Sequence, residues 1–191
     1  MTDEIDAVKR NILITGVPGI GKTTLIKKIA EELKAFHPVG FYTTEIREAG
    51  IRKGFELVSL DGRRGILSHT DIESPYRVGK YWVDLRGFEY FLDSTAFLDP
   101  STAIIIIDEI GKMECLSPKF KNRIKAILNS EKLVLATIAL KGSGLIEEIK
   151  RRQDIKLFEM TQDNRYSLLL EILKETKAIL SEMASLCRST I

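Results

Sequence analysis

The sequence has few of the residues that build disulfide frameworks or zinc sites. It contains two cysteines, Cys115 and Cys187, which lie far apart and in no metal-ligand spacing. We therefore expect both to be reduced thiols in a cytoplasmic protein. The only two histidines, His37 and His69, have no partner pattern, and we expect them on the surface or in loops without a catalytic role.

Long apolar runs and a strong excess of one charge are also missing. The longest strictly apolar run is Ala103 to Ile107, which is far too short for a membrane span. No charged-then-apolar signal segment opens the chain, so we expect no membrane association. The formal net charge of +2 does not support general nucleic-acid binding, although a local basic site stays open.

The length and composition are those of an ordinary globular protein. The 191 residues are enough for one α/β domain with a substantial core, and the 44% hydrophobic share can fill it. No linker, repeat or low-complexity stretch divides the chain. We therefore predict a single domain over residues 1–191, with its core at about 10–180.

Strand-like segments alternate with amphipathic helical segments along this domain. Such alternation is typical of a parallel sheet that is covered by helices on both faces. The continuously apolar segments 103–107 and 133–138 have the pattern of strands buried on both sides. The predicted strands are 11–14, 40–46, 54–60, 64–67, 80–85, 103–107, 133–138 and 155–160, and the predicted helices are 22–37, 88–97, 120–128, 145–151 and 164–186.

Two segments extend this plan. Asp61-Gly62 is a strong tight-turn signal, so residues 40–68 are predicted to form an antiparallel hairpin inserted into the parallel sheet or lying on its edge. The chain ends with a helix and tail at about 164–191, and the tail from Ser181 carries no motif with a readable function.

A phosphate-binding pattern follows the first predicted strand. Residues 16–23 consist of a glycine, four residues, and then glycine-lysine-threonine, the P-loop spacing. The glycines let consecutive N–H groups point at a β-phosphate, while Lys22 can reach the β- and γ-phosphates and the Thr23 hydroxyl can ligate Mg²⁺. The next helix directs its positive end at the same anion. The predicted nucleotide-binding residues here are Gly16, Val17, Pro18, Gly19, Ile20, Gly21, Lys22, Thr23 and Thr24.

An acidic pair follows the most apolar predicted strand. Ligands of parallel sheets bind beyond the carboxyl ends of the strands, so Ile107, Asp108 and Glu109 are predicted to reach the same nucleotide. We predict that Asp108 holds Mg²⁺ opposite Thr23. Glu109 is suited to orienting or deprotonating a water that attacks the γ-phosphorus. Because the acceptor of a kinase supplies the attacking oxygen itself, this pair favours hydrolysis over phosphoryl transfer.

Residues 108–114, with the sequence Asp-Glu-Ile-Gly-Lys-Met-Glu, resemble the signature of the thermophilic-type nucleoside triphosphatases. The resemblance spans about residues 10–180. It implies a RecA-like P-loop fold and slow, Mg²⁺-dependent hydrolysis of ATP, GTP and other triphosphates to diphosphate and phosphate, with weak base selectivity. Trp82 departs from the family pattern, which has a small residue there, and would alter base preference if it bordered the site. Further matching segments are 40–47, 52–55, 77–81 and 164–165.

Several cations are candidates for assisting roles. Lys112 is predicted to lie near the γ-phosphate or to pair with a site carboxylate. The alternative is that it lies in a solvated loop and forms an internal ion pair with Glu114. Arg47, with Arg52 as second choice, is predicted to offset charge on the transferring phosphoryl group, although both lie in a nearly balanced hairpin cluster with Lys53, Arg63 and Arg64. Arg165 is predicted to stack on the base or to begin a helix in solvent.

Other functions stay open at this level. In a nucleotide or polynucleotide kinase, the basic hairpin and the 77–80 loop would hold an acceptor. In a nucleotide-dependent switch, the hairpin would serve as an effector surface. Thr137 is placed either to sense the γ-phosphate or simply to fill the core. A nucleoside triphosphate is the expected partner, a monomer is favoured, and a nucleic-acid partner has no support beyond possibility.

Overall fold

One mixed sheet holds the nine strands of the computed structural model, which describes residues 9–189, of which 186–189 are described as backbone alone. The strand order is β5-β6-β4-β3-β2-β7-β8-β1-β9. The strands are β1 (Asn11–Thr15), β2 (Val39–Glu48), β3 (Ile51–Ser59), β4 (Arg64–His69), β5 (Arg77–Val78), β6 (Tyr81–Val83), β7 (Ile104–Ile110), β8 (Leu133–Ile138) and β9 (Ile155–Glu159).

The sheet has a parallel half and an antiparallel half that share β2. Strands β2, β7, β8, β1 and β9 run parallel, whereas β3, β4, β6 and β5 continue the sheet as antiparallel neighbours. Residues 39–41 of β2 pair with β7, and residues 41–48 pair with β3. The predicted hairpin therefore lies at the edge of the parallel sheet, the second of the two arrangements expected from the sequence.

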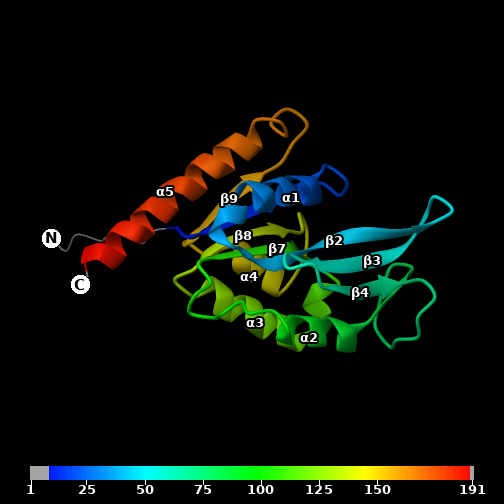
Figure 1. The fold of residues 1–191 in the computed structure, drawn as a ribbon. Helices are drawn as coiled ribbons and strands as arrows, with labels where there is room; N and C mark the ends of the chain where they lie inside the picture. The colour runs from blue at the N-terminus through cyan, green and yellow to red at the C-terminus, as the bar shows by residue number, and fades with distance from the viewer. Residues whose placement is uncertain (1–8, 190–191) are drawn as a thin grey trace.

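Helices cover both faces of the sheet, as the alternation of segments predicted. Figure 1 shows α1 (Lys22–Glu32) and α5 (Leu168–Ser189) on one face, and α2 (Leu85–Asp93) with α3 (Pro118–Leu128) on the other. The short helix α4 (Leu145–Lys150) packs into the same core as α2 and α3. Two 3₁₀ turns complete the fold, η1 (Lys34–Phe36) and η2 (Glu114–Leu116). Within residues 9–189, no helix is both long and apolar enough to cross a bilayer.

Strand β7 joins two hydrophobic cores, one on each face of the sheet. Ile104 and Ile106 pack in the core under α1 and α5, while Ile105 and Ile107 pack in the core under α2 and α3. None of the four is more than 1% exposed. Burial of each such side chain contributes about 1.5–3 kcal/mol, so β7 is strongly fixed in position. We propose one domain over residues 1–191, because both cores depend on this single sheet.

Several boundaries differ from the predictions for local reasons. Helix α1 ends at Glu32 rather than His37, and the chain tightens into η1. Helix α5 begins at Leu168 because the Asn164 side chain holds the preceding turn, accepting from Thr161 N at 2.8 Å and donating to Glu159 O at 2.8 Å. The predicted strand 80–85 is shorter because the carboxylate of Asp84 caps α2, accepting from Gly87 N.

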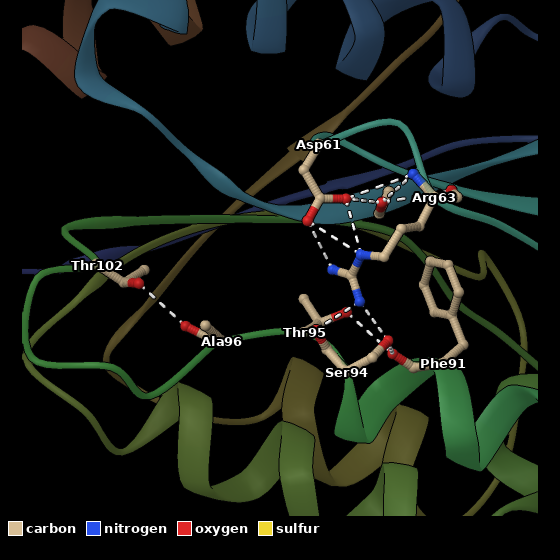
Figure 2. A network of polar contacts seen from close by, with 8 residues as sticks. Asp61, Arg63, Phe91, Ser94, Thr95, Ala96 and Thr102 are labelled. Carbon is tan, nitrogen blue, oxygen red and sulfur yellow. Dashed lines mark hydrogen bonds and ion pairs between the residues drawn. The ribbon is translucent and has the colours of Figure 1, made fainter.

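Arg63 ties the β3–β4 turn to the end of α2. Its guanidinium donates to the Asp61 carboxylate at 2.8 and 3.0 Å, and to the backbone carbonyl and hydroxyl of Ser94 (Figure 2). The same group lies 5.9 Å from the ring centroid of Phe91. These contacts hold the pKa of Asp61 down to about 2, chiefly through Arg63. This cation of the hairpin cluster therefore anchors the antiparallel strands to the helical layer.

Strand β2 passes β7 too closely at Gly40 for any side chain to fit. Gly40 has a φ of 146°, and a Cβ there would lie 1.8 Å from the Ile106 carbonyl oxygen. We expect Gly40→Ala to lower the free energy of unfolding by about 3 kcal/mol or more, because backbone must move. Urea unfolding measures this loss. Gly50→Ala is the matched control, since its φ is 79° but no atom lies within 4 Å, and it should cost only about 1–2 kcal/mol. Equal losses in the two variants would contradict the expectation.

Candidate functional site

The phosphate-binding pattern folds as strand, loop and helix. Strand β1 ends at Thr15 and α1 begins at Lys22, so residues 16–21 form the connecting loop. Gly21 precedes the helix with a φ of 112°, a conformation that glycine adopts without strain. Lys22 is 9% exposed, and its ammonium group donates to the Gly16 carbonyl at 2.9 Å, which places it across its own loop. The predicted P-loop context is therefore present.

The acidic pair sits at an irregularity in the β7–β8 ladder. Ile107 pairs with Ala136 and Ile110 pairs with Ile138, so β7 advances three residues while β8 advances two. Such bulges re-aim side chains and are common next to active sites. Here Asp108 is 1% exposed, whereas Glu109 opens into a cavity beside the P-loop.

Asp108 accepts hydrogen bonds from three threonine hydroxyls that come from three different elements. Thr23 of α1 donates to Oδ2 at 2.8 Å, and Thr43 of β2 donates to the same oxygen at 3.3 Å. Thr137 of β8 donates to Oδ1 at 2.5 Å. Thr23 and Asp108 therefore meet as the sequence predicted. The Thr137 hydroxyl is directed at Asp108, which is a polar role beyond filling the core.

Sequence reasoning missed Thr43 as part of this group. Thr43 belongs to the matching segment 40–47, but only the register between β2 and β7 shows that it lies beside Asp108. Phe41 pairs with Ile107, so Thr43 lies just past the point where β2 and β7 are in register and reaches Asp108. The contact between Thr43 and Asp108 could be found only from the order and register of the strands.

The oxygen atoms of Thr23 and Asp108 fit a hard divalent cation. Mg²⁺ prefers oxygen ligands and is commonly held by one or two carboxylates together with substrate phosphates. Among the described residues, no cluster of three or more His, Cys, Asp or Glu side chains offers a metal site made by protein alone. The hydroxyl oxygen of Thr23 and the carboxylate oxygens of Asp108 are hard donors of the kind that Mg²⁺ takes together with a phosphate ligand.

Two further acids flank Gly111 beside the same cavity. A Cβ on Gly111 would lie 2.8 Å from Glu114 Oε2 and 3.4 Å from Glu109 Cδ, so both carboxyl groups border one point. Burial raises the pKa of Glu109, Lys22 opposes the shift and Asp108 reinforces it. Burial also raises the pKa of Glu114 to about 8. Glu114 is 5% exposed, so the alternative of a solvated Lys112–Glu114 loop does not hold for this carboxyl.

Three cavities meet at the P-loop. One of about 410 Å³ lies over its outer side, and one of about 420 Å³ lies on the β2–β3 side. We call the third, of about 630 Å³, the front chamber. The front chamber is lined by Gly16, Pro18, Lys22, Thr43, Phe55, Leu67, Val78, Glu109, Gly111, Lys112, Met113, Glu114, Ala139, Leu140 and Lys141. A larger hollow of about 1100 Å³ lies beside α2 and α3 and contains none of the predicted site residues.

The structure separates the two arginines that were candidates for assisting the reaction. Arg52 lines the 420 Å³ cavity together with Lys22 and Glu109. Its guanidinium donates to Glu45 at 2.7 Å and to the Tyr81 hydroxyl at 2.8 Å, which fixes its plane. Arg47 instead binds the other oxygen of Glu45 near the exposed end of the hairpin, and its side chain is 55% exposed. The structure thus brings the second choice, Arg52, to the P-loop, and the role of Arg47 stays a prediction.

The remaining predicted residues fall into place around these cavities. Lys112 lines the front chamber, and Arg165 lines the 410 Å³ cavity with Thr24 and the P-loop glycines. The Arg165 guanidinium lies 4.6 Å from the Tyr166 ring centroid. Two predicted residues do not present side chains to the site: Val17 is 51% exposed, and Ile107 is 1% exposed in the core.

Of the cysteines and histidines without an expected role, the structure describes the side chains of Cys115, His37 and His69. Burial raises the pKa of the Cys115 thiol to about 12, which leaves it unreactive. Cys187 lies in the part of α5 whose side chains are outside the description. His37 is exposed after η1, whereas His69 lies in β4 rather than in a loop.

The comparisons with known proteins agree with this geometry. A family model described as NTPase matches residues 11–173. The chain belongs to the NTPase family. The resemblance read from residues 108–114 and the expected α/β P-loop fold are therefore confirmed.

Individual members of the NTPase family match almost the whole chain. The nucleoside-triphosphatase THEP1 of Thermotoga sp. strain RQ2 is 51% identical over 87% of this chain and 95% of its own length. The human cancer-related nucleoside-triphosphatase is 42% identical over 85% of this chain and 94% of its own. Among solved structures, the crystal structure of THEP1 from Aquifex aeolicus matches with a TM-score of 0.75 and 38% identity, covering 86% of this chain and 97% of that one.

Glu114 makes the stability of this NTPase family member depend on pH. Its folded pKa of about 8 lies above the ordinary value of 4.5, so between these values the folded state binds more protons than the unfolded state. Stability therefore falls as the pH rises from about 4.5 to about 8. We expect Glu114→Gln to lack this loss. The difference in free energy of unfolding between the variant and the wild type should therefore shift in favour of the variant, by a few kcal/mol in order of magnitude, as the pH rises through that window. Urea unfolding of both proteins at pH 5 and pH 8 measures the gain, and parallel pH curves would contradict it.

Proposed function

We propose that this protein is a Mg²⁺-dependent nucleoside-triphosphatase that cleaves nucleoside triphosphates to diphosphate and phosphate. One observation carries the proposal. The hydroxyl of Thr23 and the carboxylate of Asp108 lie 2.8 Å apart at the P-loop, and Glu109 opens into the adjoining cavity. Relatives at 42–51% identity are named nucleoside-triphosphatases, which supports the same reaction here.

The triphosphate would lie along the loop 16–21, with its phosphate oxygens facing the backbone N–H groups and the N-terminus of α1. Lys22 would turn from the Gly16 carbonyl to the β- and γ-phosphates. The base would lie in the 410 Å³ cavity, where the flat groups of Arg165 and Tyr166 can stack on any purine or pyrimidine. Stacking without base-edge recognition supports the expected weak base selectivity, so ATP, GTP and other triphosphates should all serve.

Thr23 and Asp108 would hold Mg²⁺, which when bound neutralises charge on the β- and γ-phosphates. Asp108 is oriented for this by the hydroxyls of Thr43 and Thr137, which keep both of its oxygens in place. Cytoplasmic location and a monomeric state stay predictions.

Glu109 would position the attacking water. The water oxygen forms a bond to the γ-phosphorus, and the bond from that phosphorus to the β–γ bridging oxygen breaks. The diphosphate leaves, and the water proton passes to the Glu109 carboxylate. Lys112, which lines the front chamber, would offset charge on the phosphoryl oxygens.

Glu109→Gln keeps the size of the side chain but removes the base. We expect it to retain triphosphate binding and to lower kcat by at least about 100-fold. Phosphate release under saturating ATP, together with equilibrium binding of a non-hydrolysable analogue, checks both parts. Glu171→Gln on the exposed side of α5 is the control with the same chemical change. Wild-type turnover in the Glu109 variant would refute its role.

The two arginine candidates can be separated by one matched pair. Because Arg52 borders the P-loop cavity and Arg47 does not pack there, we expect Arg52→Met to lower kcat by about 100-fold or more and Arg47→Met to change it by less than about threefold. Both substitutions remove an ion pair with Glu45, and each also removes one further hydrogen bond, to the Gly50 carbonyl for Arg47 and to the Tyr81 hydroxyl for Arg52. The unfolding free energies of the two variants are therefore compared alongside kcat. A larger loss in the Arg47 variant would reverse the assignment.

A further inference from the structure

The front chamber is far larger than hydrolysis requires. A water molecule occupies about 30 Å³ in the liquid, whereas the chamber measures about 630 Å³. Chambers of about 300–1,000 Å³ with an apolar lining and few polar groups are typical of sites for small organic molecules. Since Lys22 and Glu109 border this chamber, anything bound in it faces the position of the γ-phosphate.

The chamber is apolar on the side of the antiparallel strands and has both charged and apolar side chains on the side of the parallel strands. The antiparallel strands contribute an apolar wall of Phe55 from β3, Leu67 from β4 and Val78 from β5. The segments that follow β7 and β8 contribute Lys112 and Lys141. Neither lysine has an ion-pair partner within 4 Å among the residues that the structure describes. Such a chamber suits a molecule with a flat, weakly polar ring at one end and an anionic group at the other.

We infer that the front chamber binds a nucleoside monophosphate, which accepts the γ-phosphoryl group of the triphosphate held in the P-loop. The inference rests on the proposed placement of the triphosphate. The phosphate of the acceptor would lie between Lys112 and Lys141, beside Glu109, and its base would lie against Phe55 and Val78. A base can stack on an aromatic ring whatever its identity, and two lysines match a phosphate dianion in charge.

The transfer balances without any further reactant. A phosphate oxygen of the acceptor forms a bond to the γ-phosphorus, and the bond to the β–γ bridging oxygen breaks. The products are two nucleoside diphosphates, and any proton on the attacking oxygen passes to Glu109. Water at the same position would give hydrolysis, so an empty chamber leaves the nucleoside-triphosphatase reaction as the default.

Glu114 supports the same occupant. Burial keeps its carboxyl group protonated at neutral pH, so it adds no negative charge opposite a phosphate. A protonated carboxyl can also donate a hydrogen bond to a phosphate oxygen of the acceptor.

Binding tests the chamber directly. The P-loop is first filled with Mg²⁺ and a non-hydrolysable ATP analogue, and AMP, GMP, CMP, UMP and dTMP are then titrated in turn by calorimetry. We expect saturable one-site binding of at least one monophosphate with a Kd below about 1 mM. Failure of all five to bind would overturn the inference, whereas phosphate release from ATP alone would leave the proposed hydrolase intact.

Transfer is tested with γ-labelled ATP and the monophosphate that binds. Label in the corresponding diphosphate is the expected result. Label found only in free phosphate, even with the monophosphate bound, would overturn the acceptor assignment while sustaining hydrolysis.

Two variants locate the site. Lys141→Met should weaken binding of the monophosphate at least tenfold, whereas Lys177→Met on the exposed face of α5 should leave it unchanged. Val78→Phe places a larger side chain in the chamber and should likewise weaken binding, with the affinity of the ATP analogue reporting that the protein is folded. Unaltered monophosphate affinity in both chamber variants would place the ligand elsewhere and overturn the inference.

Discussion

The site depends on how one buried carboxylate is compensated. Asp108 is 1% exposed, and a charge in that position is costly unless hydrogen bonds satisfy it. The hydroxyls of Thr23, Thr43 and Thr137 supply those bonds from α1, β2 and β8. The same contacts bring the end of β7 to the beginning of α1. The hydrogen bonds that stabilise the carboxylate therefore also assemble the phosphate and metal site. Strand β7 packs in both cores, which keeps this arrangement in place.

Much of this arrangement could be predicted from local sequence. The P-loop spacing, the apolar strand 104–107 and the acids that follow it identified both halves of the site, because each depends on residues that are neighbours in the chain. The parallel core was predictable for the same reason. What local patterns could not give was register: Thr43 reaches Asp108 only because β2 pairs with β7 at Phe41. The choice between Arg47 and Arg52 also depended on which residue of the hairpin faces the P-loop. The two arginines are only five positions apart in the chain, and the sequence does not show which of them does so.

Burial was the other property that the sequence concealed. Glu114 follows a glycine and a lysine in a segment that is polar enough for a solvated loop, yet its carboxyl is buried beside Glu109 with a pKa of about 8. The reason is the small residue between the two acids, since Gly111 leaves the space that the Glu114 side chain enters. Three carboxyl groups thus share one end of the sheet in different environments. Asp108 is held by hydroxyls, Glu109 lies near Lys22, and Glu114 is 5% exposed at the wall of the front chamber.

The antiparallel half of the sheet decides how open that end is to water. A parallel sheet with a P-loop would expose Glu109 and Lys22 at its rim, but β3, β4 and β5 place an apolar wall opposite them. Partial exclusion of water strengthens the electrostatic interactions of Lys22 and Arg52 with a phosphoryl group. If the front chamber binds the acceptor that we infer, this wall would favour a bound organic oxygen over water as the attacking group. The slow hydrolysis that the family resemblance implies would then be the reaction of a chamber without its acceptor.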